Sequence, residues 1–392
     1  MSEIPVVGQH EPEKRPPFVA SSEKRAAPEL PPLAPDKRVG FAIVGLGRLS
    51  LEAILPAIVT CKLARVVALM SGDKDKGRRV AEQYGVPADA VYDYDEWDRL
   101  GANPDVQVVY IATPNGLHRE QVEAAARVKK HVLCEKPMAN DAVDAQAMVD
   151  ACKKVGVTLM VAYRAQYEPH IREAIRILRS GEFGALKLIE AHNGQVQDRQ
   201  SQWRHDGPLA GGGALPDIGL YCLNFARAVT GEEPVGLFAW TWSTPGDSRF
   251  TEIEENVAWQ MRFPSGVVAK LSASYDAHEA RPARLYFQTA SVKIDPAFSY
   301  KGIRLTVTRR SPDQPDVEIV EERIIEEKNQ FATEMDHMAL CVLTARVPRT
   351  PGEEGVQDHK LMDAIYQSAR EQRMIEFAPI AGRDAFRGPE LP

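Results

Sequence analysis

A lysine, an aspartate and a tyrosine in this sequence have the types and positions that proton transfer requires. Lys136 follows the apolar run 131–134, within Glu135-Lys136-Pro137. Asp217 and Tyr221 follow a glycine-rich turn at a spacing of four residues, so on a helix both lie on one face. A tyrosine has a reference pKa of about 10 and needs a nearby cation to act as a base near neutral pH. The structural alternative is that Asp217 caps a helix and Tyr221 packs in the core.

A second group of residues predicts a dinucleotide site. The apolar run 40–44 leads into Gly45 and Gly47, and the small residue Ser50 follows just before a helix. Gly45 permits a tight turn, and Gly47 lets a pyrophosphate approach the backbone at the helix start. Ser50 stands where a third glycine or alanine is usual. The predicted cofactor contacts in this turn are Gly45, Leu46, Gly47, Arg48 and Leu49.

The residues after the second strand favour NADP over NAD. This strand ends at Ser71 without the acidic residue that would bind both ribose hydroxyls of NAD, and Lys74 and Lys76 follow closely. Arg48 could add a further cation to a 2'-phosphate or to the adenine face. The alternative for Lys74 and Lys76 is a solvated helix start.

Two further segments are expected at the carboxyl edge of the same sheet, where ligands bind. Thr113, Asn115 and His118 follow the strand 106–112, and Glu135 and Lys136 follow the next strand. At that edge the charge of Lys136 would lie near the nicotinamide, where it could orient a sugar hydroxyl.

The elements that must position these residues alternate as in βαβ units. We expect strands at 40–44, 65–70, 106–112, 131–134 and 158–162, and helices at 51–60, 75–84, 118–126 and 142–155. Right-handed crossovers then give one doubly wound parallel sheet, a Rossmann domain over residues 39–163. The fold class is α/β.

Residues 164–392 are predicted to form an α+β domain with a large open, mostly antiparallel sheet, for substrate binding and oligomerisation. Helices are expected at 168–180, 215–229, 330–345 and 357–371, a strand near 187–192, and alternating stretches at 256–275 and 284–294. Residues 1–38 are proline-rich and form an arm, either a disordered leader or an ordered segment on the cofactor or a neighbouring subunit.

The composition of the 392 residues is that of an ordinary globular protein, with 44% hydrophobic and 26% charged residues. A net charge of −7 argues against a nucleic-acid partner. No apolar run approaches the roughly 18 residues of a membrane span. No apolar leader or twin arginine opens the chain, so we expect a cytoplasmic protein. The five cysteines lack a CxxC spacing, which predicts reduced thiols and no metal site.

The glycine turn, Glu135-Lys136-Pro137 and the glycine-rich turn before Asp217 occur in the order and at the spacing of a known group. Over residues 39–371 the chain resembles the glucose-fructose oxidoreductase, inositol dehydrogenase and rhizopine-catabolism (Gfo/Idh/MocA) superfamily. Within it, Tyr163-Arg164 and Gln202-Trp203-Arg204 are among the segments most similar to the glucose-fructose and aldose-aldose oxidoreductase branch.

The resemblance implies a tightly bound NADP that oxidises one aldose at C1 to its lactone and is reoxidised in place by reducing a second sugar. It implies catalytic roles for Lys136 and Tyr221, and substrate positioning by Asp217 and Arg164. Many relatives carry histidine where Tyr221 stands. The cofactor contacts that the resemblance adds or supports are Arg48, Ser71, Lys76, Glu135, Lys136, Arg164, Trp203 and Arg204.

Three functions are compatible with these residues. The first is sugar-to-sugar transfer with a resident NADP, and the second is an aldose dehydrogenase that releases its nucleotide in each cycle. The third is a non-catalytic NADP-binding regulator, which would not need the pair Lys136 and Tyr221. An open sheet also leaves a face to bury, so a homodimer or homotetramer is expected.

Overall fold

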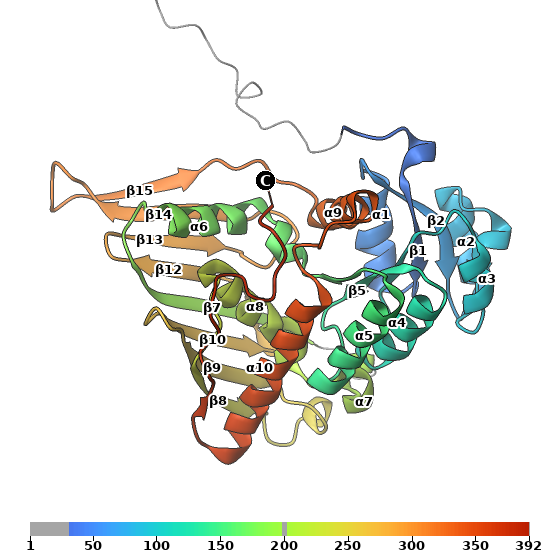
Figure 1. Ribbon diagram of the computed structural model, residues 1–392. Helices are drawn as coiled ribbons and strands as arrows, with labels where there is room; N and C mark the ends of the chain where they lie inside the picture. Colours follow the sequence, from blue (N-terminus) through green and yellow to red (C-terminus); the bar gives the residue numbers. More distant parts are fainter. Residues whose placement is uncertain (1–30, 198–201, 392) are drawn as a thin grey trace, which may run out of the picture. The chain divides into compact units, whose positions relative to one another are not determined.

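The structure is a computed structural model that describes residues 31–197 and 202–391 (Figure 1). Pro32–Leu391 forms one compact unit, so the domain boundary predicted at residue 163 stays a prediction. Most of the predicted arm, residues 1–30, lies outside the described residues. Its described end includes a 3₁₀ turn at Pro35–Lys37.

The N-terminal half contains a six-stranded parallel sheet in the order β3-β2-β1-β4-β5-β6. Its strands are β1 (Val39–Val44), β2 (Ala64–Met70), β3 (Val91–Tyr92), β4 (Val108–Ile111), β5 (His131–Glu135) and β6 (Leu159–Ala162). Every residue of β1 is buried, as expected for a parallel strand covered on both faces. This strand order is that of a doubly wound Rossmann sheet, which confirms the predicted fold class.

The helices between these strands follow the predicted order. They are a π-helical turn (Ser50–Ile54), α1 (Leu55–Ile58), α2 (Lys74–Tyr84), α3 (Trp97–Ala102), α4 (His118–Arg127) and α5 (Ala142–Val155), with 3₁₀ turns at Ala88–Ala90 and Asn115–Leu117. The caps are local: Asp73 and Asp141 accept backbone N–H groups at the starts of α2 and α5. Strand β3 and helix α3 were not predicted from the sequence, because each is too short to show a hydrophobic period.

The C-terminal half contains a ten-stranded sheet in the order β15-β14-β13-β12-β7-β10-β9-β8-β16, with β11 paired to β7. Its strands are β7 (Leu186–Val196), β8 (Gly236–Trp242), β9 (Asn256–Arg262), β10 (Val268–Ser274), β11 (Asp276–Ala280), β12 (Ala283–Phe287), β13 (Ala290–Asp295), β14 (Arg304–Arg310), β15 (Glu318–Arg323) and β16 (Ile375–Glu376). Among the described strands of this sheet, only the pair β7 and β10 is parallel. The prediction of a mostly antiparallel sheet is therefore confirmed.

One face of this sheet carries helices α6, α8 and α10 (Figure 1). The helical elements here are the 3₁₀ turns Arg164–Tyr167, Trp203–His205 and Ser248–Phe250, a π-helical turn (Leu215–Gly219), α6 (Pro169–Ser180), α7 (Gly207–Ala210), α8 (Leu220–Thr230), α9 (Gln330–Thr344) and α10 (Gly352–Glu371). No helix of the described chain is long and apolar enough to cross a membrane. All five cysteines are buried, and none of them forms a disulfide.

Helix α10 begins earlier than predicted, at Gly352 instead of Gln357. Glycine lowers helix propensity, so the start predicted from the sequence lies after the two glycines, Gly352 and Gly355. Both glycines are needed for close packing: a Cβ on Gly352 would lie 2.7 Å from Val149, and one on Gly355 would lie 2.9 Å from Met138. Helix α10 contacts both α5 and β8, so it packs against the Rossmann half and the ten-stranded sheet together.

Candidate active site

The turn after β1 has the shape that a dinucleotide requires. Gly45 has φ +91°, and a Cβ there would lie 2.8 Å from Thr113 and 2.9 Å from the Ala112 carbonyl. A Cβ on Gly47, by contrast, would meet nothing within 4 Å. Ser50 donates its hydroxyl to the Gly45 carbonyl at 2.5 Å and so holds the turn against the helix. The open space at Gly47 lets a pyrophosphate approach the backbone, so these residues fit a dinucleotide.

The polar groups predicted to bind a 2'-phosphate differ in the contacts that they already make with other protein groups. Ser71 is buried at the end of β2, and the ammonium of Lys76 donates to the Leu46 carbonyl in the glycine turn. Arg48 is exposed and pairs with Glu52 at 2.8 Å. Lys74 lies 3.3 Å from a Glu96 oxygen, so its charge is partly offset by a carboxylate.

Lys136, Asp217 and Tyr221 come together at the carboxyl end of β5. The Lys136 ammonium donates to the Asp217 carbonyl at 2.6 Å and to its carboxylate at 3.1 Å. The same ammonium lies 4.7 Å from the centroid of the Tyr221 ring. Asp217 lies in the π-helical turn Leu215–Gly219, and Tyr221 follows in the first turn of α8. The predicted convergence of the three side chains is therefore present in the geometry.

Asp217 is the hub of the charges in this site. Its carboxylate accepts the Arg204 guanidinium at 3.1 Å and the Tyr275 hydroxyl at 2.9 Å, in addition to Lys136. Burial raises the pKa of Asp217, but Lys136 and Arg204 outweigh burial and hold that pKa well below its usual range. Asp217 is therefore ionised near neutral pH and fixes the two cations. Arg204 also lies over the Trp203 ring at 4.5 Å.

Arg164 contacts the other side of Tyr221. Its Nε donates to the Tyr221 hydroxyl at 3.1 Å, and its guanidinium lies 4.4 Å from the Tyr300 ring centroid. Burial lowers the pKa of Arg164, but the neighbouring tyrosine hydroxyls raise it above its ordinary value. Only 4% of Arg164 is exposed, and each of its nitrogens contacts a protein acceptor. Its predicted roles in substrate and cofactor binding stay predictions.

Glu135 belongs to a buried chain of hydrogen bonds behind Lys136. The Tyr110 hydroxyl lies 2.8 Å from Glu135 and 3.1 Å from Glu334 of α9. Burial raises the pKa of Glu135, and it raises that of Glu334 well above its usual range. Because one hydroxyl can donate only once, a protonated Glu334 that donates to Tyr110, which in turn donates to Glu135, satisfies this chain.

Thr113, Asn115 and His118 lie at the carboxyl edge of the sheet as predicted, but protein contacts use much of their polar capacity. Thr113 contacts Gln121 at 2.6 Å, and Asn115 donates to the Ala210 carbonyl at 2.8 Å. His118 is fully buried, with one ring nitrogen 2.9 Å from the Thr113 carbonyl and the other 3.1 Å from the Pro137 carbonyl. In this arrangement the three side chains fix the edge of the site, and their predicted cofactor contacts stay predictions.

Comparisons with known proteins agree with this geometry. The model of an oxidoreductase family with an NAD-binding Rossmann fold matches residues 39–163, and the GFO/IDH/MocA C-terminal domain matches residues 171–293. D-xylose 1-dehydrogenase (NADP(+)) of Haloarcula marismortui is 32% identical over 87% of this chain and 94% of its own. This chain belongs to the Gfo/Idh/MocA family.

A crystal structure of aldose-aldose oxidoreductase from Caulobacter crescentus, complexed with glycerol, is 40% identical and covers 87% of this chain and 100% of its own, with a TM-score of 0.82. D-xylose 1-dehydrogenase (NADP(+)) 2 of Haloferax volcanii is 29% identical over 86% of this chain and 99% of its own.

Several residues of this Gfo/Idh/MocA site were not found from the sequence. Tyr275 lies between β10 and β11 and contacts Asp217, while Tyr300, Gln330 and Glu334 come from the loop after β13 and from α9. They lie far along the chain from Lys136 and carry no local motif. The one signal available was the start of α9, where Asn329 caps a helix that opens on the polar Gln330.

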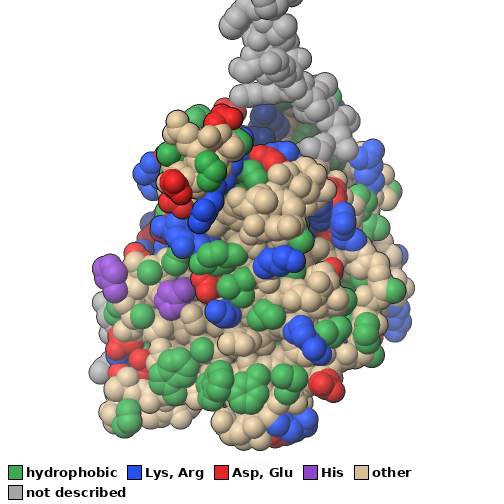
Figure 2. Space-filling model, turned by 90° about the vertical axis from the view of Figure 1, so that its left-hand side faces the viewer, with side chains coloured by type: hydrophobic (Ala, Val, Ile, Leu, Met, Phe, Trp, Pro, Cys, Tyr) green, Lys and Arg blue, Asp and Glu red, His purple; other side chains and the backbone are tan. Residues whose placement is uncertain are grey.

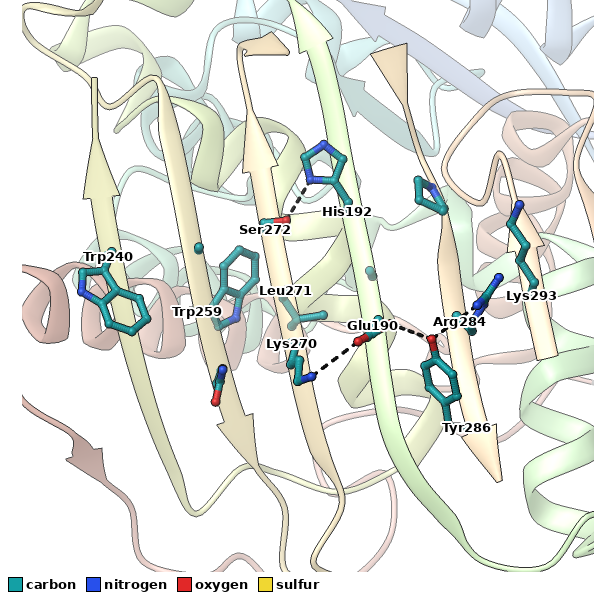
Figure 3. A pocket seen from close by; sticks show the side chains of 14 residues that line it. Glu190, His192, Trp240, Trp259, Lys270, Leu271, Ser272, Arg284, Tyr286 and Lys293 are labelled. Atoms are coloured by element: carbon teal, nitrogen blue, oxygen red, sulfur yellow. Dashed lines mark hydrogen bonds and ion pairs between the residues drawn. The ribbon is translucent and has the colours of Figure 1, made fainter. Parts of the chain in front are cut away.

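A separate hollow lies away from this site, on the face of the ten-stranded sheet that no described helix covers. Figure 3 shows its lining, and its volume is about 530 Å³. Glu190 accepts the Tyr286 hydroxyl at 2.8 Å and lies 3.5 Å from the Lys270 ammonium. None of the predicted site residues is among those that line the hollow, so it is separate from the candidate active site. Within the described part of the chain, no group of three or more His, Cys, Asp or Glu side chains could hold a metal ion.

Proposed function

We propose that this protein is an NADP-dependent sugar oxidoreductase that oxidises an aldose at C1 to the aldonolactone and reduces a second sugar to an alditol, while the cofactor stays tightly bound. The observation that carries the proposal is the convergence of Lys136, Asp217 and Tyr221 at the same carboxyl edge of the Rossmann sheet as the dinucleotide turn. The Caulobacter structure is that of an aldose-aldose oxidoreductase, and the Haloarcula relative is an NADP-dependent xylose dehydrogenase. Both names support an aldose as the substrate.

The residues that would hold NADP surround the glycine turn and the carboxyl edge of the Rossmann sheet. They are Gly45, Leu46, Gly47, Arg48, Leu49, Ser71, Lys76, Thr113, Asn115, His118, Glu135, Lys136, Arg164, Trp203 and Arg204. A bound NADP would supply the hydride acceptor for C1 of the aldose and, once reduced, the hydride donor for the second sugar. Ser71 and Lys76 would bind the 2'-phosphate, because no carboxylate ends β2.

The proton travels separately from the hydride. The Tyr221 oxygen takes the proton of the C1 hydroxyl as the carbonyl forms, and in the second half-reaction it returns that proton to the alkoxide of an open-chain sugar. Lys136 lies between Asp217 and the Tyr221 ring, where its ammonium can also bind a sugar hydroxyl. Asp217 keeps Lys136 in place. Burial lowers the pKa of Lys136, but Tyr221 and Asp217 raise it above its usual value, so the ammonium stays charged.

The test is turnover without added nucleotide. The purified protein, incubated with one aldose alone, should form equal amounts of aldonolactone and alditol. Denaturing the same protein should release one NADP per chain. If both products are absent while added NADP restores lactone formation, sugar-to-sugar transfer is excluded.

A second candidate is a dehydrogenase that releases its nucleotide in each cycle. The two archaeal relatives favour it, because both are NADP-dependent D-xylose 1-dehydrogenases that align over most of their length. For this candidate the denatured protein would release no nucleotide, and lactone would form only with added NADP. The same two measurements therefore separate the candidates.

We propose further that a second copy of this chain covers the open face of the ten-stranded sheet. Figure 2 shows hydrophobic side chains in a row low on one face, at the height where Figure 1 places β8, and Trp240 and Trp242 of β8 are exposed. Figure 3 shows Glu190 near Lys270 and Arg284, so the face carries both signs of charge and can complement itself about a two-fold axis. Trp240→Asp should shift the protein toward monomers in sedimentation analysis, and an unchanged mass would contradict this interface.

A further inference from the structure

Arg164 is a buried cation with an unusual set of partners. It opens the 3₁₀ turn after β6, and only 4% of it is exposed. Apart from the Tyr221 hydroxyl, its hydrogen-bond acceptors are all oxygens that do not ionise. They are the Phe298 carbonyl at 2.6 Å, the Ser299 carbonyl at 3.3 Å and the Gln330 side chain. Among the described residues its nitrogens form no ion pair with a carboxylate. A buried charge without a counter-charge is costly, so an anion formed nearby would gain from it.

The carboxyl groups closest to Arg164 supply little of that counter-charge. Glu135 and Glu334 both interact with it at longer range, and burial raises the pKa of each. The one ionisable group to which Arg164 donates a hydrogen bond is the Tyr221 hydroxyl, at 3.1 Å from Nε.

Lys136 occupies a different position relative to Tyr221. Its ammonium donates to the Asp217 carbonyl and carboxylate. Both cations lie 4.7 Å from the centroid of the Tyr221 ring, so what distinguishes them is the hydrogen bond of Arg164 to the hydroxyl. No hydrogen bond joins Lys136 to the Tyr221 hydroxyl in the described structure. Lys136 therefore has a carboxylate partner, Asp217, in addition to the Tyr221 ring, whereas Arg164 donates a hydrogen bond to the oxygen that would carry the proton.

We propose that Arg164 is the positioning residue that stabilises the deprotonated form of Tyr221 during sugar oxidation, and that Lys136 is committed to Asp217. The proposal rests on the proposed function in taking Tyr221 as the proton acceptor. A hydrogen bond from a charged donor favours the anionic form of its acceptor. Arginine also suits this role because it keeps its own proton, so it cannot compete with the substrate hydroxyl as the proton source.

The other groups around Tyr221 come from several elements, and they act on its hydroxyl together with Arg164. The titratable ones are Lys136 and Tyr300, and Lys136 in turn interacts with Asp217 and Glu135. Phe298 adds an apolar surface, with its ring centroid 5.8 Å from that of Tyr221. Lys136 is the only other cation in this set, so it is the variant to compare with Arg164.

The test is the pH profile of kcat/KM for aldose oxidation in three variants, Arg164→Gln, Arg164→Lys and Lys136→Gln. Activity falls at low pH as the tyrosine oxygen becomes protonated. Loss of the arginine should move this acid limb upward by about 1–3 pH units, the size of the effect of one adjacent opposite charge. Arg164→Lys keeps a cation and should move the limb less, and Lys136→Gln should also move it less than Arg164→Gln. An unmoved limb in Arg164→Gln, or a larger movement in Lys136→Gln, overturns the proposal.

A second measurement does not depend on turnover. Ultraviolet difference titration of the wild type against Tyr221→Phe isolates the ionisation of this one tyrosine, and the same subtraction in the Arg164→Gln background should show it at higher pH. If the wild type oxidises no aldose, the proposed function fails, but this titration still tests Arg164. If Arg164→Gln does not fold, as judged by circular dichroism, Arg164→Met takes its place, because it also removes the cation. An unshifted titration in the folded variant overturns the inference.

Discussion

Lys136 and Asp217 are joined at two points, because the ammonium donates both to the aspartate backbone carbonyl at 2.6 Å and to its carboxylate at 3.1 Å. These residues come from the two halves of the chain, the end of β5 and the turn before α8. The second carboxylate oxygen accepts Arg204. A single ionised aspartate thus fixes two cations at the edge of the Rossmann sheet.

Asp217→Asn should be strongly destabilising, because it leaves Lys136, whose side chain is only 11% exposed, and the partly buried Arg204 without their counter-charge. Removing one partner of a buried pair costs about 3–5 kcal/mol, and we expect a loss of unfolding free energy of this size in urea. Asp276→Asn is the matched control, since Asp276 pairs with Arg249 at the exposed surface and should cost about 1 kcal/mol or less. Equal losses in the two variants would mean that the Asp217 charge is not needed.

Tyr221→Phe should abolish most of the proton transfer and leave the fold intact. A positioned acid or base contributes about 10²- to 10⁴-fold, so kcat for aldose oxidation should fall in this range. The ring and its contact with Phe298 remain, so the thermal midpoint should change little. Tyr286→Phe, on the open face of the ten-stranded sheet, should keep full activity. A Tyr221→Phe protein with near-normal turnover would remove this residue from the mechanism.

Substitutions at Gly45 and Gly47 should separate folding from cofactor binding. Gly47→Val places its side chain in open space, so the unfolding free energy should stay within about 0.5 kcal/mol, while NADP binding falls at least about tenfold because the pyrophosphate needs that space. Gly45→Ala has both a positive φ and a 2.8 Å contact with Thr113, and should lose about 1–3 kcal/mol of stability. Fluorescence titration and urea unfolding measure the two effects. Normal NADP affinity in Gly47→Val would place the cofactor elsewhere.

The Rossmann half was predictable because its signals are local. Every residue of β1 is buried, so the strand is one apolar run, and the glycine turn follows it directly. The site around Tyr221 was only partly predictable. Lys136 and Asp217 lie in recognisable motifs. Tyr275 and Gln330 reach the site only through the folding of distant segments. The sequence around these two residues does not differ from that of an ordinary strand end or helix start.

Arg164 shows most clearly why sequence reasoning stopped short. The resemblance assigned it to substrate positioning, and nothing in the pattern Tyr163-Arg164 reveals that its Nε contacts the Tyr221 hydroxyl. That contact depends on the loop after β13, whose carbonyls at Phe298 and Ser299 hold the rest of the guanidinium. Such loops follow from tertiary packing and carry no periodic signal.

Ser71→Asp should shift cofactor preference from NADP toward NAD. A carboxylate at the end of β2 can bind the ribose hydroxyls of NAD and repels a 2'-phosphate. We expect the ratio of kcat/KM for NADP to that for NAD to fall by about 10- to 100-fold, measured on protein stripped of nucleotide. Lys74→Ala is the control: its ammonium already pairs with Glu96, so the ratio should change little. An unchanged ratio in Ser71→Asp would show that the 2'-phosphate binds away from β2.

His359→Gln should flatten the acid side of the stability profile. His359 is buried in α10 and accepts the Ala139 backbone N–H at 3.0 Å, and burial lowers its pKa to about 4. In the unfolded chain the pKa of histidine is about 6.5, so between these values the unfolded state binds more protons and stability falls as the pH is lowered. The contribution is complete above about pH 6.5 and is lost as the pH falls to about 4, a change of about 3 kcal/mol at most.

Glutamine keeps an acceptor for the Ala139 N–H but cannot take up a proton, so His359→Gln isolates this contribution. The unfolding free energy of the wild type in urea should drop more steeply than that of the variant as the pH is lowered through this window. His278→Gln, at an exposed position on β11, should follow the wild-type curve. Parallel curves for the wild type and His359→Gln would contradict this prediction. His359 would then take up its proton in the folded protein as readily as in the unfolded chain, and the buried contact with Ala139 would not keep the imidazole neutral.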